Sequence, residues 1–205
     1  MNKIQKYKDF QTITERSKND PIPEISENKI GIILLGTPGL GKSYFSDNYI
    51  QTKRKIKRFS TDDVSLRFTK DPNKYYKTAS ELNLKSLLTF IEQEHSFIYD
   101  TTGTHTENIT KVEKSAKEKN YKIIFIHLIG PIEVSIRQNL ERDRQVDLEY
   151  IEYSYTSQFP NMRKYYEELK PDSYYIVYNK DGKYKFYKYS KGNILRRKVD
   201  KYVEI

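Results

Sequence analysis

A glycine-rich segment near the start of the chain carries the clearest chemical signature. Residues 36–43 match the pattern G-x-x-x-x-G-K-S/T, in which glycines let the backbone N–H groups turn toward phosphate oxygens. The residues of this segment are Gly36, Thr37, Pro38, Gly39, Leu40, Gly41, Lys42 and Ser43. In such a loop the lysine contacts the β- and γ-phosphates and the serine hydroxyl binds Mg²⁺. The segment therefore predicts a site for a nucleoside triphosphate and magnesium.

The sequence on either side of this loop supports that interpretation. Residues 30–35 form an apolar, β-branched run that is typical of a buried parallel strand. The residues that follow the loop predict a helix, whose N-terminal dipole would favour bound phosphate. A chance glycine-lysine turn would lack this strand-loop-helix context.

Carboxylates follow two other predicted strands. Asp62 and Asp63 come just after residues 56–60, and Asp100 ends the strand 97–100. Ligands of doubly wound sheets bind beyond the carboxyl ends of strands, and a carboxylate there can accept the proton of an attacking hydroxyl. Asp100 could hold Mg²⁺ through water or orient an acceptor. The structural alternatives are a helix cap for Asp63 and a turn residue for Asp100.

A pair of arginines follows the predicted helix 132–141. Arg142 and Arg144 precede the next predicted helix, at the place where a lid would close over a transferring phosphoryl group. Guanidinium groups can stabilise the charge that spreads over such a group. The alternative is a solvated helix end, with Arg137 and Glu141 paired along the helix.

The elements that would position these residues alternate between strand and helix. This alternation predicts an α/β fold with a parallel sheet covered on both faces by helices, and with the glycine-rich loop it resembles the three-layer sandwich of P-loop NTPases. Further helices are expected at 78–94, 106–119 and 148–169, the last broken at Pro160, and a further strand at 121–129. The C-terminal segment differs, because 174–178, 184–189 and 194–199 read as consecutive strands with turns between them.

Four blocks together resemble the P-loop kinases of the polynucleotide-kinase-like and zeta-toxin-like group. They are the glycine-rich loop, residues 59–64, residues 97–103, and residues 137–144 with the following 146–162. The resemblance covers about residues 30–162, and with the composition of the rest we expect three parts of the chain. These are an N-terminal extension and linker (1–29), a P-loop kinase domain (30–172), and a basic, tyrosine-rich β appendage (173–205).

The resemblance also implies roles for the site residues. Asp62 would be the general base, with Asp63 as the alternative, and Arg142 and Arg144 would form the lid. Asp63, Arg67 and Asp100 would contact the acceptor. The family carries an arginine three residues after the base, where this sequence has Ser65, so either Arg67 replaces that arginine or the acceptor differs from the family's.

The implied reaction is Mg²⁺-dependent transfer of the ATP γ-phosphoryl group to a hydroxyl. The preferred acceptor is a nucleic-acid 5′-hydroxyl of DNA or RNA. One alternative is a kinase for a small acceptor, such as a nucleoside, a nucleotide or a nucleotide sugar. Another is a nucleic-acid-binding module that binds a nucleotide without transferring phosphate.

The net charge of +9 is concentrated near the C-terminus, where residues 170–205 hold 10 basic and 4 acidic residues. Within them, 183–189 alternates basic and aromatic side chains. Such a strand could bind nucleic acid by contacting phosphates and stacking bases. An amphipathic hairpin with packed tyrosines would show the same pattern.

Composition excludes several classes of protein. The 205 residues include no cysteine, which excludes disulfides, thiolate metal sites and a cysteine nucleophile. The three histidines are widely spaced, and His127 in an apolar strand is expected to be a core residue. With no long apolar run and no signal-peptide pattern, we expect a soluble cytoplasmic protein without membrane contact. The oligomeric state is left open.

Overall fold

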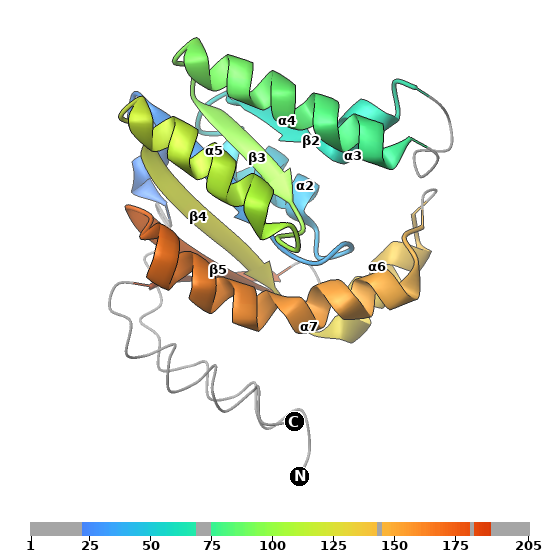
Figure 1. The fold of residues 1–205 in the computed structure, drawn as a ribbon. Coiled ribbons are helices and arrows are strands. Elements are labelled where there is room, and N and C mark those ends of the chain that lie inside the picture. The colour runs from blue at the N-terminus through green and yellow to red at the C-terminus, as the bar shows by residue number, and fades with distance from the viewer. Residues whose placement is uncertain (1–21, 69–74, 143–144, 181–182, 190–205) are drawn as a thin grey trace.

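A computed structural model describes residues 22–68, 75–142, 145–180 and 183–189, which form a sheet of six strands in the order β2-β3-β1-β4-β5-β6 (Figure 1). Strands β1 to β5 pair in parallel, and β6 pairs antiparallel to β5. The strands are β1 (Ile30–Leu35), β2 (Lys57–Ser60), β3 (Phe97–Thr101), β4 (Lys122–Ile129), β5 (Ser173–Lys180) and β6 (Lys183–Tyr189).

Helices connect these strands as predicted, and within the described residues none has the length and apolar character needed to cross a bilayer. The α-helices are α2 (Lys42–Phe45), α3 (Thr61–Ser65), α4 (Tyr76–Glu92), α5 (Thr106–Glu118), α6 (Ile132–Leu140) and α7 (Leu148–Lys164). The shorter 3₁₀ or π segments are η2 (Pro23–Ser26), η3 (Ser46–Ile50) and η4 (Tyr165–Leu169).

Helix α7 corrects one expectation, because it continues through Pro160 instead of breaking there. Proline has no N–H to donate to the carbonyl four residues earlier, which belongs to Thr156. Both residues lie on the exposed side of α7, so water can bond that carbonyl in place of the missing donor. The helix therefore continues through Pro160, and its buried side, including Met162, packs on the sheet.

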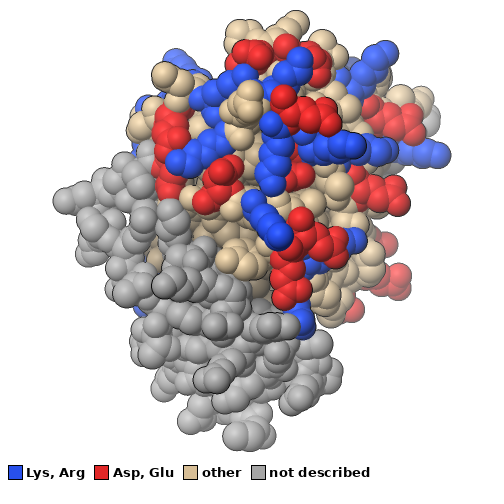
Figure 2. All heavy atoms as spheres, turned by 60° about the vertical axis from the view of Figure 1, so that its left-hand side comes forward, with Lys and Arg blue, Asp and Glu red and all other residues tan. Residues whose placement is uncertain are grey.

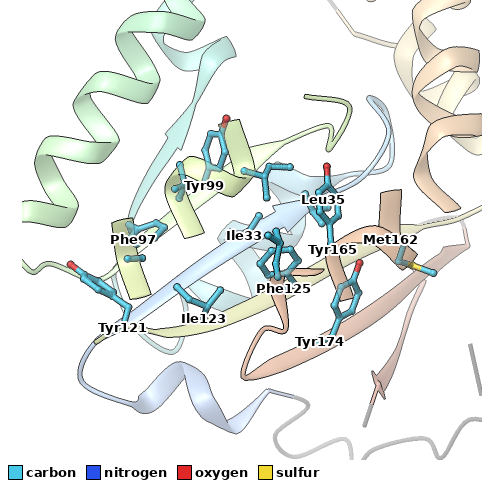
Figure 3. Close-up of a cluster of buried hydrophobic side chains, with 14 of the residues drawn as sticks. Ile33, Leu35, Phe97, Tyr99, Tyr121, Ile123, Phe125, Met162, Tyr165 and Tyr174 are labelled. Carbon is cyan, nitrogen blue, oxygen red and sulfur yellow. The ribbon is translucent and has the colours of Figure 1, made fainter. Parts of the chain in front are cut away.

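The side chains of β1 show how the sheet is covered on both faces. Ile33 and Leu35 pack with residues of α4, α5 and α7, whereas Ile32 and Leu34 pack with residues of η2, α2 and η3. Figure 1 shows α4 and α5 in front of the sheet and α2 behind it. In the first cluster Phe125 lies next to Ile33 (Figure 3), and its ring meets that of Tyr165 with centroids 5.8 Å apart. The predicted three-layer α/β fold is confirmed.

The C-terminal segment forms strands as expected, and these strands extend the central sheet. β5 continues the parallel pairing from β4, with Tyr175 opposite Ile126, and β6 closes the edge. Tyr174 and Tyr187 are buried in the cluster that contacts α7, and Tyr175 is buried in the other cluster. The proposed division after residue 172 thus runs within one sheet and one core. The third predicted strand, 194–199, lies outside the described residues.

The end of the predicted N-terminal linker packs against the sheet. Ile22 and Ile25 are both 1% exposed and belong to the cluster that contains α2. Between them the Glu24 carboxylate accepts hydrogen bonds from the Ser173 hydroxyl, at 3.0 Å, and the Tyr175 hydroxyl, at 2.5 Å. These buried contacts attach residues 22–26 to β5.

Charged side chains on the surface are mixed in sign. On the face shown in Figure 2, the lysines and arginines are interspersed with aspartates and glutamates. Among the described residues several surface charges are paired, for example Lys29 with Glu94 at 3.0 Å and Lys119 with Glu92 at 2.7 Å. Exposed pairs of this kind contribute little to the stability of the fold. The mixture of signs means that no described part of this face carries a large net positive or negative charge.

His127 on β4 is buried, as expected, and it makes stability depend on pH. Its Nδ1 lies 3.0 Å from the Tyr174 hydroxyl, and burial lowers its pKa from 6.5 to about 3. Between pH 6.5 and about pH 3 the His127 imidazole is protonated in the unfolded chain but neutral in the folded chain, so the free energy of unfolding falls as the pH falls. From pH 7 to pH 5 we expect this group to reduce the free energy of unfolding by about 2 kcal/mol.

Urea unfolding of the wild type and of His127→Gln at both pH values measures this effect. Glutamine keeps a polar group but does not titrate, so the variant should lack this part of the decrease. An identical pH dependence in the two proteins would contradict the assignment to His127.

Candidate active site

The site lies at the carboxyl edge of the sheet, where the segments after β1, β2 and β3 meet. In Figure 1 the arrowheads of β3 and β4 point toward the side of the molecule that carries α3 and α6. A pocket of about 520 Å³ opens there. Its lining includes Pro38, Lys42, Ser43, Ser60, Thr61, Asp62, Tyr76, Asp100, Thr101, Thr102, His105, Arg142, Val146, Asp147 and Tyr150.

The glycine-rich loop after β1 has the curled backbone that its sequence predicts. Gly39 and Gly41 adopt φ values of +85° and +79°, which side-chain-bearing residues rarely tolerate. A Cβ atom on Gly39 would also collide with the carbonyl oxygen of Ser135 on α6. The Ser135 hydroxyl donates to the Pro38 carbonyl, so α6 helps to fix the loop. The loop is thus preformed for an anion, with helix α2 starting at its end.

Two residues from the C-terminal strands also hold this loop, and sequence reasoning did not identify them. Asn179 on β5 donates its side-chain amide to the Leu40 carbonyl at 2.8 Å. Tyr184 on β6 places its hydroxyl 3.5 Å from the Gly41 carbonyl, and burial raises its pKa to about 12, so the hydroxyl keeps its proton. No local motif marks these positions, because their contacts depend on how β5 and β6 join the sheet.

Lys42 reaches back over the loop. Its ammonium donates to the Gly36 carbonyl at 2.7 Å and to the Thr37 carbonyl at 3.4 Å. Burial lowers the pKa of Lys42, while the nearby carboxylates of Asp100 and Asp62 oppose this shift. A partly desolvated ammonium over a loop of inward-turned amides suits the charge of a polyphosphate.

Asp100 lies at the end of β3, between Ser60 of β2 and Leu34 of β1. It is 9% exposed, and burial raises its pKa, which the charges of Lys42 and Arg58 oppose. Asp100 and Ser43 line the same pocket, and together they offer the oxygen ligands that Mg²⁺ prefers. Nowhere in the described part do three or more His, Cys, Asp or Glu side chains form a metal cluster. The residues therefore suit an ion that takes its other ligands from phosphate and water.

The two neighbouring aspartates of α3 point to different partners. Asp62 lines the pocket, whereas Asp63 Oδ2 pairs with Arg58 Nη2 at 3.3 Å and is not among the lining residues. Arg67 is exposed in the turn after α3 and also lies outside that lining. Of these three residues, Asp62 therefore has the position that a base for the pocket requires.

Arg142 is the predicted lid residue that the structure brings to the site. It follows α6, lines the pocket, and its charge contributes to the lowered pKa of Lys42. Arg144 lies outside the described residues, so its role stays a prediction.

The remaining wall of the pocket comes from aromatic, hydroxyl and acidic side chains that the sequence did not single out. Tyr150 on α7 places its hydroxyl 3.1 Å from Thr102 Oγ1 and 3.3 Å from Thr104 Oγ1. Tyr76 begins α4, and Asp147 caps α7 by accepting the Glu149 N–H at 3.0 Å. An aspartate before a helix start is the only local signal among them. His105, to which no role was assigned, also lines the pocket.

Curated relatives match part of this chain. It is 25% identical over 159 residues to the rat (Rattus norvegicus) 6-phosphofructo-2-kinase/fructose-2,6-bisphosphatase 1, covering 69% of this chain and 34% of that protein. It is 26% identical over 128 residues to the L-seryl-tRNA(Sec) kinase of Methanococcus maripaludis, covering 60% of this chain and 50% of that protein. The chain thus spans between a third and a half of the length of these relatives.

Solved structures share the fold. A structure of the PezAT toxin–antitoxin system of Streptococcus pneumoniae superposes with a TM-score of 0.59 at 18% identity, covering 89% of this chain and 77% of that one. The AvrRxo1-ORF1:-ORF2 complex with ATP gives a TM-score of 0.65 at 14% identity, covering 85% and 64%. At these identities the likeness concerns the fold alone.

The family model described as "AAA domain" matches residues 32–169, from β1 through the glycine-rich loop and the carboxylates to the end of η4. That range is more than half of the chain and contains the predicted phosphate, base and lid positions. This match shows that the chain belongs to the AAA domain family, and the strand order and the glycine-rich loop agree with a P-loop domain.

Proposed function

We propose that this protein is a magnesium-dependent kinase that transfers the γ-phosphoryl group of ATP to a hydroxyl of an acceptor bound in the pocket. The observation that carries the proposal is the lining of one pocket by Lys42, Ser43, Asp62, Asp100 and Arg142. Phosphoryl transfer depends mainly on positioning and charge stabilisation, and these five residues supply a cation, a metal site, a base and a second cation.

Each residue has a defined task in this reaction. Asp62 accepts the proton of the acceptor hydroxyl as its oxygen bonds to phosphorus. Lys42 and Arg142 offset the negative charge on the phosphate oxygens. Ser43 and Asp100 would hold Mg²⁺, which when bound neutralises charge on the phosphates. Asp63, paired with Arg58, and Arg67 are proposed to contact acceptor groups outside the pocket.

The proposed acceptor group is the 5′-hydroxyl of a nucleoside unit, either the 5′ end of DNA or RNA or a free nucleoside. Tyr76 and Tyr150 offer aromatic rings to a base, and the hydroxyls of Thr101 and Thr102 can contact a sugar. In the described part of β6, Tyr187 is buried and Tyr184 packs on the core, which favours the amphipathic-hairpin interpretation there. The proposal therefore includes both the 5′ end of a nucleic acid and a free nucleoside as the source of the 5′-hydroxyl.

The names of the curated relatives motivate a second candidate. One is a 6-phosphofructo-2-kinase and another acts on seryl-tRNA, so acceptors within the family range from sugar phosphates to a tRNA-linked serine. A sugar or nucleotide-sugar acceptor would use the same Asp62 and the same loop. We expect either reaction to take place in the cytoplasm, where ATP is available.

Transfer assays with ATP labelled in the γ-phosphate test the proposal. The panel contains 5′-hydroxyl DNA and RNA oligonucleotides, nucleosides, nucleotides, sugars and nucleotide sugars, each with Mg²⁺ and with a chelator. We expect Mg²⁺-dependent label on oligonucleotides, on nucleosides or on both, removable by phosphatase. Label confined to sugars or nucleotide sugars would favour the second candidate. Binding of ATP and oligonucleotides without transfer to any acceptor would refute kinase activity in favour of a binding module.

A further inference from the structure

The glycine-rich loop has a second side, away from the acceptor pocket. The pocket is lined by Lys42 and Ser43 but not by Gly41. A Cβ atom on Gly41 would lie 2.8 Å from the Tyr184 hydroxyl and 3.9 Å from the Gln138 side-chain oxygen. In the proposed function the γ-phosphate faces Asp62 and Asp100, which leaves the other end of the loop for the nucleoside. In that orientation the donor nucleoside would leave the loop on the side of Gly41 and Tyr184.

An exposed aromatic ring lies at this end of the loop. Tyr44 directly follows Ser43 in α2, and its side chain is 58% exposed. One of its faces stacks on Tyr184, with ring centroids 6.3 Å apart and planes inclined by 14°. Single exposed aromatic side chains are common on protein surfaces, so it is the position of this ring beside the phosphate-binding loop, and its stacking on Tyr184, that point to a ligand.

The partner of Tyr44 is itself held firmly. The Tyr184 ring meets Tyr49 edge-on at 5.3 Å and Phe45 at 5.6 Å, and Phe45 is fully buried. Its hydroxyl lies by the Gly41 carbonyl, so the same side chain contacts the loop and supports Tyr44. This arrangement keeps the Tyr44 ring oriented before any ligand arrives, which lowers the entropic cost of stacking.

We propose that Tyr44, supported by Tyr184, is the stacking platform for the base of the nucleotide donor. The inference rests on the nucleotide-binding part of the proposed function and adds a contact that the loop motif does not supply. Because every base has a π-face, stacking adds affinity for the nucleoside end of the donor while the loop binds its phosphates. Removing the Tyr44 ring should therefore weaken the binding of nucleotides more than the binding of inorganic polyphosphate.

Removing the ring tests this difference in equilibrium binding, without any acceptor. Tyr44→Ala is expected to weaken binding of ATP, in a non-hydrolysable form, on the order of tenfold. Binding of inorganic tripolyphosphate, which has no base, should change by less than about twofold. Tyr44→Phe keeps the ring and should restore most of the ATP affinity. Unchanged ATP affinity in Tyr44→Ala, or equal losses for ATP and tripolyphosphate, would overturn the proposal.

A fluorescence measurement locates the base directly, because the chain has no tryptophan. Tyr44→Trp introduces a single indole at the platform, and stacking of a base should quench its emission when ATP is added but not when tripolyphosphate is added. Leu82→Trp on α4 is the control, since Leu82 is 41% exposed and lies outside the pocket lining. Equal responses of the two variants would count against the platform. If ATP but not tripolyphosphate quenches the indole at position 44, and the protein transfers no phosphate to any acceptor, the stacking platform stands. The proposed kinase activity would then be wrong.

Discussion

Replacing Asp62 with asparagine is expected to lower kcat for phosphoryl transfer by about 10²–10⁴-fold while changing the affinity for ATP by less than about threefold. Asparagine has nearly the same shape but cannot accept a proton from the acceptor hydroxyl. Asp62 lines the pocket and is one of the two carboxylates that act on the charge of Lys42. We assign Asp62 no contact with the ATP phosphates, so the substitution should lower the rate of phosphoryl transfer and leave the affinity for ATP nearly unchanged.

Steady-state kinetics with saturating acceptor and equilibrium binding of ATP measure the two quantities separately. Asp47→Asn is a suitable control, because Asp47 is an exposed carboxylate of η3 that lies outside the pocket lining and 3.6 Å from Arg58. Retention of more than a third of the wild-type kcat would remove Asp62 from the role of base.

The positions of the loop and of two carboxylates followed from the sequence because each is determined locally. A buried strand must end where its apolar run ends, and in a parallel sheet those ends meet at one edge. Residues 36–43, Asp62 and Asp100 all follow this rule. The family resemblance favoured Asp62 over Asp63, but the physical difference between them came from the coordinates, because successive side chains on a helix differ in direction by about 100°. Their sequence context is nearly the same, yet only Asp62 is directed into the pocket.

The contacts of the C-terminal strands could not be predicted in the same way. An alternation of lysine and tyrosine fits both a surface that binds nucleic acid and a strand that buries one face. The register of β6 against β5, with Tyr187 opposite Ile176, decides which rings are buried. The same register brings Asn179 and Tyr184 to a loop about 140 residues earlier, at contacts separated by 139 and 143 positions in the chain. Such long-range contacts leave no trace in local sequence patterns.

The Lys42→Met variant is expected to lose about 10²–10³-fold in kcat, and its affinity for ATP should also fall. Methionine keeps most of the volume of the lysine stem but removes the ammonium that contacts the loop carbonyls and would contact the phosphates. Because Lys42 also opposes the raised pKa of Asp100, the variant should raise that pKa further and weaken Mg²⁺ binding at neutral pH.

Kinetics at several Mg²⁺ concentrations test both consequences of this substitution. We expect the Mg²⁺ concentration for half-maximal rate to increase in Lys42→Met, and to decrease again as pH is raised and Asp100 loses its proton. Lys55→Met, at an exposed position before β2, is the matched control and should behave like the wild type. A loss of kcat with unchanged Mg²⁺ dependence at every pH would mean that Lys42 acts only on the phosphates. The proposed coupling between Lys42 and Asp100 would then be wrong, although the phosphate-binding role of Lys42 would stand.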